Sequence, residues 1–145
     1  MKNNIQSEKY EALKLKNQIC FPLYAASREI IKRYRPYLDE LGLTYTQYIA
    51  MMVFWEEQKV TVKDLGEKLR LDSGTLTPML KTLETKGYVA RSRSKEDERV
   101  LNVEITPAGM ALRERAVDIP GKMAQCVPLN MEEAQQLYQL LQRIL

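Results

Sequence analysis

The chain has 145 residues, of which 45% are hydrophobic and 28% are charged, and its formal net charge is +3. These values are typical of a globular protein with a single core. No apolar run is long enough to cross a membrane, and Met1–Asn17 lacks the apolar stretch of a secretory signal, so we expect a cytoplasmic protein that does not contact a membrane. The charge is uneven: Ser73–Lys95 holds five basic residues and one acidic residue, which fits either a polyanion-binding surface or an ordinary solvated one.

Histidine and cysteine usage narrows the chemistry. The chain has no histidine, which excludes Ser–His and Cys–His nucleophilic pairs and removes the commonest zinc ligand. Its two cysteines, Cys20 and Cys126, are too far apart in sequence for a CxxC redox motif or a zinc knuckle. A reducing cytoplasm disfavours a permanent disulfide between them, but a transient disulfide remains an alternative. We therefore predict a protein without metal, cofactor or enzymatic activity.

Apolar residues at three- and four-residue steps predict two helices in the first part of the chain. The first covers Glu8–Tyr34 and should end near Pro36, because the residue before a proline disfavours helical geometry. Gly42 marks a turn, and Tyr45–Glu57 forms the second helix.

Two capped helices are expected next. Thr61–Asp64 has the form of a capping box and begins a short helix. Asp72 or Ser73 caps the following helix, which ends at Gly87. Pro78 is expected early in this helix, where its missing N–H costs least.

The hydrophobic period then changes from helical to alternating. Val89–Arg93 and Leu101–Ile105 alternate as strands do, and the charged run Ser94–Arg99 joins them into a hairpin. Two helices followed by a hairpin are the pattern of a winged helix-turn-helix. The fold class that we predict is therefore mainly α with one small β-hairpin.

The last part of the chain is again helical. A long helix is predicted from Thr106–Pro107 to about Ala124, with a kink or break at Pro120–Gly121, and a final helix over Asn130–Leu145. Both terminal segments of the chain are amphipathic, and one short domain has little core to bury them. Pairing with a second copy is the economical solution, so we expect N- and C-terminal dimerisation helices and a two-fold homodimer.

Ser73–Lys86 has two distinct faces on a helical wheel. One side collects the apolar residues Leu76, Met79, Leu80 and Leu83. The other side is small, hydroxylated and basic at one point, and it collects Gly74, Thr77, Pro78, Lys81 and Thr85. Small residues allow close approach to bases, methyl and ring carbons suit thymine methyls, and a lysine suits a phosphate. A capped, solvent-exposed helix is the alternative interpretation. The candidate DNA contacts in this helix are Ser73, Thr75, Thr77, Pro78 and Lys81.

The hairpin loop is a candidate wing. Arg99 would enter the minor groove, where narrow A·T tracts attract guanidinium groups. Asp97, two positions earlier, would orient Arg99 by a charge-assisted hydrogen bond. A hydrated turn is the alternative interpretation. With Arg91 in the first strand and Lys95 in the loop, these residues complete the predicted site for double-stranded DNA.

Six stretches of the sequence carry a family resemblance. They are Asn17–Cys20, Ala25–Glu29, Thr44–Tyr45, Leu71–Leu80, Asp97–Arg99 and Val117–Pro120. Together they resemble the MarR family of transcription regulators, specifically its organic hydroperoxide-sensing branch of the OhrR type. The resemblance covers nearly the whole chain. It implies a single domain over residues 1–145, with dimerisation helices at 8–40 and 107–145 and a winged helix region at 45–106.

The resemblance also implies a redox site. In that branch the early cysteine is oxidised, and two tyrosines of the partner subunit hydrogen-bond to it; the matching positions are Cys20, Tyr34 and Tyr45. Along one straight helix, Cys20 and Tyr34 would lie roughly 21 Å apart and could not touch. Two-cysteine members link the early cysteine to a late one in the other subunit, and Cys126 matches that late position. If Cys126 is incidental, a small cellular thiol would resolve the sulfenic acid.

The sequence thus predicts a homodimeric repressor that binds an inverted-repeat operator and releases it when an organic hydroperoxide oxidises Cys20. A second hypothesis keeps the fold but makes the signal a small phenolic ligand, with Cys20 as a buried structural residue. A third hypothesis, a thiol peroxidase or reductase that uses Cys20 and Cys126, is opposed by the absence of CxxC, histidine and a βαβ pattern.

Overall fold

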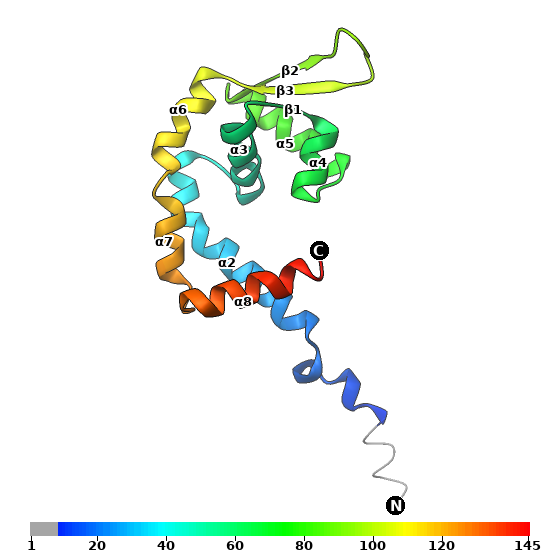
Figure 1. The fold of residues 1–145 in the computed structure, drawn as a ribbon, viewed down its shortest axis with the longest axis vertical. Coiled ribbons are helices and arrows are strands. Elements are labelled where there is room, and N and C mark those ends of the chain that lie inside the picture. The colour runs from blue at the N-terminus through cyan, green and yellow to red at the C-terminus, as the bar shows by residue number, and fades with distance from the viewer. Residues whose placement is uncertain (1–8) are drawn as a thin grey trace, which may run out of the picture. The chain divides into compact units, whose positions relative to one another are not determined.

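The computed structural model describes residues 9–145, which form helices and one three-stranded antiparallel sheet (Figure 1). The predicted fold class, mainly α with a winged helix, is confirmed. The density of contacts divides the chain into two units at the boundary between Tyr34 and Arg35. None of the described helices combines the length and the apolar character that a membrane crossing requires.

The first predicted helix begins later than expected. Its predicted start, Glu8, lies outside the described residues. Two short 3-10 helices, η1 (Glu11–Leu13) and η2 (Leu15–Asn17), precede the helix α2 (Cys20–Leu41). The Asn17 side chain donates to the Glu11 carbonyl oxygen at 2.8 Å, a local bond that competes with regular helical pairing.

The prediction that this helix ends near Pro36 was wrong, because α2 continues to Leu41. A proline inside a helix costs about 3 kcal/mol, since it removes one hydrogen bond and crowds the preceding turn. Leu38 and Leu41 follow it and are only 2% and 4% exposed. Full burial of a leucine contributes about 1.5–3 kcal/mol, so the two together offset the proline. Gly42 then turns the chain with a φ of 66°, as predicted.

Three helices of the second unit match the sequence prediction closely. They are α3 (Tyr45–Glu57), α4 (Val62–Leu69) and α5 (Ser73–Thr85). Each helix has an N-cap residue whose side-chain oxygen accepts a hydrogen bond from the backbone N–H three residues later. The N-cap residues are Thr44, Thr61 and Asp72, respectively. Because the first N–H groups of a helix have no partner within it, these caps fix where each helix starts.

The sheet contains one strand more than the predicted hairpin. The strands β2 (Val89–Arg93) and β3 (Leu101–Ile105) form that hairpin, and β1 (Lys59–Thr61) pairs with the other edge of β3. With three residues, β1 is too short to show an alternating pattern in the sequence. Val60 and Val103 lie opposite each other and are both buried, which fixes the register of this pair.

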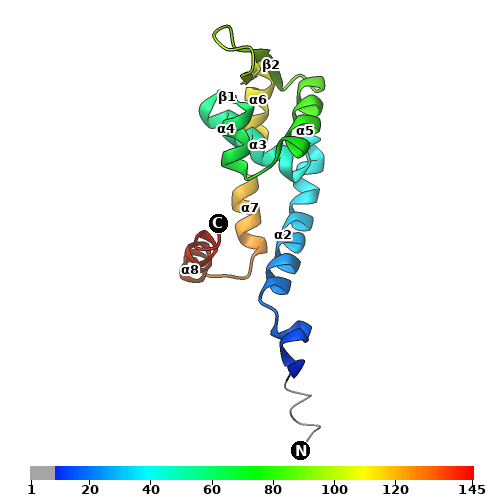
Figure 2. The same cartoon turned by 90° about the vertical axis from the view of Figure 1, so that its right-hand side faces the viewer.

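Three helices complete the chain: α6 (Pro107–Ala116), α7 (Ile119–Cys126) and α8 (Met131–Gln142). The predicted break is present, but it lies at Val117–Asp118 rather than at Pro120–Gly121. Pro120 falls in the first turn of α7 because a proline is tolerated there and not in a helix interior. Figure 2 shows α6 and α7 following one another along the same side of the second unit.

The core lies where α3, α4 and α5 meet the sheet. Its largest fully buried side chains are Phe54, Met51, Leu65, Leu80, Leu83, Val89 and Val103. By contrast, α8 buries none of its residues against the described part of the chain. Large apolar side chains on α8 are instead exposed, among them Met131, Leu137, Tyr138 and Leu140. The winged helix region therefore has its own core, whereas the apolar side chains of α8 do not contribute to it.

Gly109 in α6 occupies a position where no side chain fits. A Cβ atom there would lie 2.1 Å from the carbonyl oxygen of Tyr88. Gly109→Ala should therefore lower the free energy of unfolding by about 2–3 kcal/mol, because the core is overpacked. Gly121→Ala in α7 is the matched control, since nothing lies within 4 Å of its Cβ, and it should raise stability by about 0.5–1 kcal/mol. Urea unfolding followed by circular dichroism measures both changes, and equal midpoints for the two variants would contradict this account.

Candidate functional site

The helix α5 presents the two faces that the sequence predicted. Asp72 caps it by accepting the backbone N–H of Thr75 at 2.8 Å. Its apolar residues are at most 7% exposed, and they are Leu76, Met79, Leu80 and Leu83. The predicted DNA contacts of α5 are all exposed, and we call them the reading face: Ser73, Thr75, Thr77, Pro78 and Lys81. The core therefore fixes the rotation of α5 so that the reading face points outward.

Pro78 lies in α5 where the predicted cap at Asp72 puts it, but its missing N–H has a cost at this position. It is the sixth residue of the helix rather than part of its first turn, so its missing N–H leaves the Gly74 carbonyl without the usual helical donor. The helix persists because the buried leucines around the proline hold both of its turns against the core. The Thr82 hydroxyl also donates to the Pro78 carbonyl oxygen at 3.0 Å, which keeps the following turn closed.

A close turn sets the position of α5 against α4. A Cβ atom on Gly66 would lie 2.9 Å from the Leu71 carbonyl oxygen and 2.9 Å from Cδ1 of Leu76, so only glycine allows this approach. Arg70 ends α4 in the left-handed backbone region with a φ of 53°. The backbone N–H of Leu71 then donates to the Gly66 carbonyl oxygen at 3.0 Å. These contacts orient the reading face relative to the rest of the winged helix.

The loop 94–100, which we call the wing, protrudes beyond β2 and β3 (Figures 1 and 2). Asp97 Oδ1 accepts the backbone N–H of Arg99 at 3.0 Å and its Nε–H at 3.1 Å, so the expected hydrogen bond between these residues is present. These hydrogen bonds, the backbone one first, hold the pKa of Asp97 below its ordinary value. The Arg99 side chain is nevertheless 90% exposed. The wing therefore presents a partly oriented guanidinium to its surroundings.

The other two predicted wing residues have different environments. Lys95 is exposed in the wing. The Arg91 guanidinium donates from Nε and Nη2 to Oε2 of Glu84 at 3.0 and 2.8 Å, and its backbone N–H donates to Oε1 at 3.1 Å. These hydrogen bonds lower the pKa of Glu84. Arg91 therefore ties β2 to α5, and its contact with DNA stays a prediction.

Cys20 is an exposed residue at the start of α2, so the prediction that it lies in mid-helix was wrong. The reason is the pair of 3-10 turns that replaces the expected helix before it. The N-terminus of a helix favours a negatively charged group. Tyr34 is partly buried on the same helix, roughly 21 Å further along, so the two side chains do not meet within one chain.

Tyr45 is the first residue of α3, and its burial raises the pKa of its hydroxyl. It is therefore a protonated donor at neutral pH. Its ring centroid lies 6.5 Å from that of Tyr48, in a tilted arrangement.

Cys126 is the last residue of α7 and is partly buried. Its Sγ lies 4.0 Å from the hydroxyl oxygen of Tyr37 in α2, within hydrogen-bonding distance for sulfur. Cys20 and Cys126 do not form a disulfide with each other within the chain. Sequence reasoning missed Tyr37, because no local pattern connects it with a cysteine so far along the chain.

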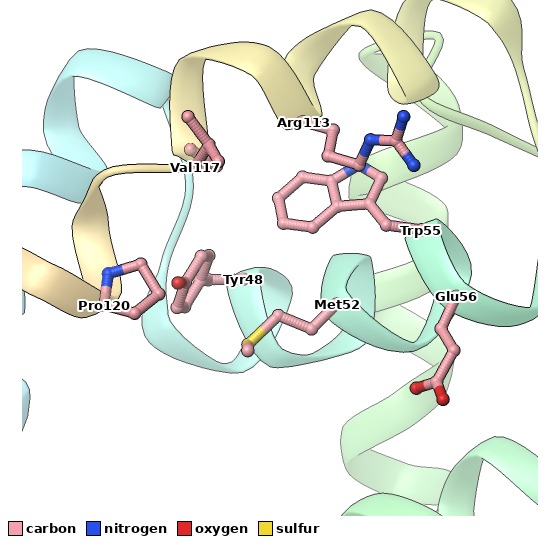
Figure 3. A pocket seen from close by; sticks show the side chains of 8 residues that line it. Tyr48, Met52, Trp55, Glu56, Arg113, Val117 and Pro120 are labelled. Carbon is pink, nitrogen blue, oxygen red and sulfur yellow. The ribbon is translucent and has the colours of Figure 1, made fainter.

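An open hollow of ≈ 300 Å³ lies between α3 and the α6–α7 break (Figure 3). Its lining is mostly apolar and consists of Tyr48, Met52, Trp55, Glu56, Arg113, Ala116, Val117 and Pro120. Trp55 is part of this lining, and its Nε1–H donates to the Gly109 carbonyl oxygen at 2.9 Å. Among the described residues, no three His, Cys, Asp or Glu side chains gather in the manner of metal ligands.

Comparison with known proteins decides the family. A family model for the transcriptional regulators SarA and Rot matches residues 29–115. The organic hydroperoxide resistance transcriptional regulator of Bacillus subtilis is 49% identical over 137 residues, covering 94% of this chain and 93% of the relative. The chain belongs to the MarR family, in its organic hydroperoxide (OhrR-type) branch.

Two solved structures of the regulator AbfR of Staphylococcus epidermidis are also similar to this chain. Reduced AbfR bound to DNA superimposes with a TM-score of 0.80 at 34% identity, covering 94% of this chain and 93% of AbfR. Disulfide-formed AbfR gives a TM-score of 0.67 at 35% identity, with coverages of 96% and 98%. The SarA/Rot match contains the reading face and the wing but neither Cys20 nor Cys126. The SarA/Rot match therefore bears on the winged helix region and not on the cysteines.

The tie between Glu84 and Arg91 should make stability depend on pH. Because Arg91 holds the pKa of Glu84 below its ordinary 4.5, the carboxylate stabilises the folded protein fully above that pH. This contribution is lost as the pH falls through the lower pKa of the folded state. Glu84→Gln should therefore unfold at a lower urea concentration than wild type at neutral pH, and the gap should close in acid. Urea midpoints measured down to about pH 3 check this, with the exposed Glu96→Gln as control; a gap that stays constant would contradict it.

Proposed function

We propose that this chain is a homodimeric, redox-responsive repressor, which binds an inverted-repeat operator when reduced and releases it when an organic hydroperoxide oxidises Cys20. The observation that carries the proposal is the pairing of the outward reading face of α5 with the Asp97-oriented Arg99 of the wing. Binding to the chromosome implies a cytoplasmic location and a regulatory role rather than an enzymatic one. Relatives of this chain are transcriptional regulators.

The composition of the reading face supports DNA binding. Serine, threonine and proline on this face leave room for the edges of base pairs, while Lys81 has the reach and charge for a backbone phosphate. Arg99 has the charge and exposure that a narrow minor groove attracts. The reduced relative AbfR was solved bound to DNA, and its fold matches that of this chain.

Exposed apolar side chains support the homodimer. They occur in α8 and around the start of α2, where Ile19, Phe21 and Tyr24 are at least 44% exposed. Covering such side chains with a second copy removes them from water at about 25 cal/mol per Å². A two-fold pair would present two reading faces to half-sites about one helical turn apart.

The chemistry of the signal starts at the exposed Cys20 thiol. Its sulfur would attack the outer oxygen of the hydroperoxide, so that the O–O bond breaks, an alcohol leaves and the cysteine becomes a sulfenic acid. In the reduced dimer, Tyr34 and Tyr45 of the partner would donate hydrogen bonds to this sulfur. Oxidation would break those hydrogen bonds and change the orientation of the two subunits. The distance between the two reading faces would then no longer match the distance between the operator half-sites.

Cys126 is our candidate for the resolving thiol. Its sulfur would attack the sulfenic sulfur of the partner's Cys20, forming a disulfide and releasing water. A disulfide-formed state of AbfR, whose fold is similar to that of this chain, supports the proposal that a disulfide is the end product.

The hollow beside Trp55 favours a second candidate function. A mostly apolar cavity of ≈ 300 Å³ with Arg113 at its rim has the size and lining for a small aromatic acid. Under this alternative the same repressor is released by a phenolic ligand, and Cys20 has no sensing role.

The role of Arg99 can be tested with DNA. On a duplex operator selected from random sequences by the reduced protein, Arg99→Ala should bind about 5- to 100-fold more weakly, because one groove contact is lost. The dependence of log affinity on log salt should also become shallower by about one unit per lost ionic contact. Fluorescence anisotropy over a salt series measures both effects. Arg143→Ala removes the same charge from the exposed end of α8 and should bind as wild type; equal losses in both variants would contradict the wing assignment.

The role of Cys20 can be tested on the bound complex. Cumene hydroperoxide should release wild type, whereas Cys20→Ser should stay bound at the same dose. Cys126→Ser should still be oxidised at Cys20, but it should lose the dimer-sized band on non-reducing electrophoresis. Equal release of Cys20→Ser and wild type by peroxide would sink the proposal. Release by salicylate, with no response to peroxide, would establish the ligand-responsive alternative instead.

A further inference from the structure

Three side chains of the second unit form a cluster that the proposed mechanism has not yet used. The Tyr37 hydroxyl lies 4.0 Å from Cys126 Sγ, and Lys122 Nζ lies 5.5 Å from the centroid of the Tyr37 ring. Lys122 and Cys126 are one helical turn apart on α7, so both face the same tyrosine of α2. We call these three residues the resolving cluster.

We propose that Tyr37 is the positioning residue of the resolving thiol: it donates a hydrogen bond to the Cys126 sulfur and holds it on the face of α2 where the partner's Cys20 is received. This inference rests on the proposed redox function. It adds a third tyrosine, specific to Cys126, to the two that serve Cys20.

The protonation of Tyr37 agrees with a donor role. The hydrogen bond with Cys126, followed by the charge interaction with the same residue, raises the pKa of Tyr37 above its ordinary value of 10.0. The phenol therefore keeps its proton at neutral pH, and it is available as the donor that the proposal assigns to it. Lys122 packs a cation against the ring face, which restricts how the ring can turn away.

The spacing of the tyrosines on α2 explains why this position is useful. Tyr34 and Tyr37 are three residues apart, so on one helix their Cβ atoms lie about 5–6 Å apart on the same side. In the proposed dimer, Tyr34 binds the partner's Cys20 while Tyr37 binds Cys126 of its own chain. One helix thus brings the sensing sulfur of one subunit close to the resolving sulfur of the other.

The resolving step is balanced without another reagent. The Cys126 thiolate attacks the sulfenic sulfur of the partner's Cys20, an S–S bond forms, the S–O bond breaks and hydroxide leaves as water after taking up a proton. The electrons that reduce the peroxide oxygen come from the two cysteines. Tyr37 is neither oxidised nor consumed, and its hydrogen bond to Cys126 is released when the disulfide forms.

The test separates the two thiols. In a Cys20→Ser background, iodoacetamide alkylates only Cys126, and mass spectrometry follows the rate at fixed neutral pH. Tyr37→Phe should slow this alkylation about three- to tenfold, the value of one modest hydrogen bond to an anion. Tyr10→Phe, a change on an exposed tyrosine before η1, is the control and should leave the rate unchanged. An unchanged or faster rate in Tyr37→Phe overturns the inference, because a tyrosine that merely covers Cys126 would expose the thiol when shortened.

A second measurement follows the complete reaction. After cumene hydroperoxide is added to the full-length dimer with both cysteines, Tyr37→Phe should form the Cys20 sulfenic acid at the wild-type rate, as trapped by dimedone. The intersubunit disulfide should then appear severalfold more slowly on non-reducing electrophoresis. A wild-type rate of disulfide formation overturns the role of Tyr37. If wild type itself forms no sulfenic acid at Cys20, the proposed function fails, yet the alkylation assay still reports on Tyr37 and Cys126.

A spectroscopic signature guards against an effect of misfolding. The ¹³Cζ resonance of Tyr37, assigned by its loss in Tyr37→Phe, should shift when Cys126 is replaced by alanine, because the phenol loses its acceptor. Circular dichroism should show the same helix content in all variants. A ¹³Cζ resonance that is unmoved by Cys126→Ala would mean that the hydrogen bond is absent, and the inference would fall.

Discussion

The burial of one apolar stripe on α5 is the constraint on which the rest of the structure depends. Leu76, Leu80 and Leu83 are almost fully enclosed, and α5 packs against α3, α4 and β2. Rotating the helix about its axis would expose leucines at about 1.5–3 kcal/mol each. The outward direction of the reading face is therefore a consequence of core packing. Small and hydroxylated residues on that face contribute little to stability, which leaves them free to be selected for contact with another molecule.

Polar ties then join the neighbours of α5 to this core. The Glu84–Arg91 pair connects α5 with β2 at the base of the wing, and the Trp55 indole connects α3 with α6. The base of the wing and the reading face are thus held at a fixed separation. At its tip the wing is held by local hydrogen bonds, such as that from Arg99 to Asp97.

The accuracy of the sequence prediction follows the range of the forces involved. The bounds of α3, β2 and β3 were confirmed, because caps and alternating patterns are local signals. The predicted helix end near Pro36 was wrong, because burial of leucines further along α2 outweighs the local penalty of the proline. The two faces of α5 were predictable from period alone. The engagement of Arg91 with Glu84 and the contact of Tyr37 with Cys126 were not, because each depends on segments that the sequence does not show to be neighbours.

The helix α2 connects the proposed chemistry with the winged helix. It carries Cys20 at its start and Tyr34 and Tyr37 along its length, and its last turns bury Leu38 and Leu41 in the core. A hundredfold loss of operator affinity requires about 2.7 kcal/mol of coupling. The proposal places two hydrogen bonds at the sensing sulfur and one at the resolving sulfur of each subunit. At about 1 kcal/mol each, these bonds in the two subunits together supply this amount. The proposed release of the operator therefore does not require unfolding. Replacing these hydrogen bonds by a disulfide supplies enough free energy if α2 moves as one rigid element.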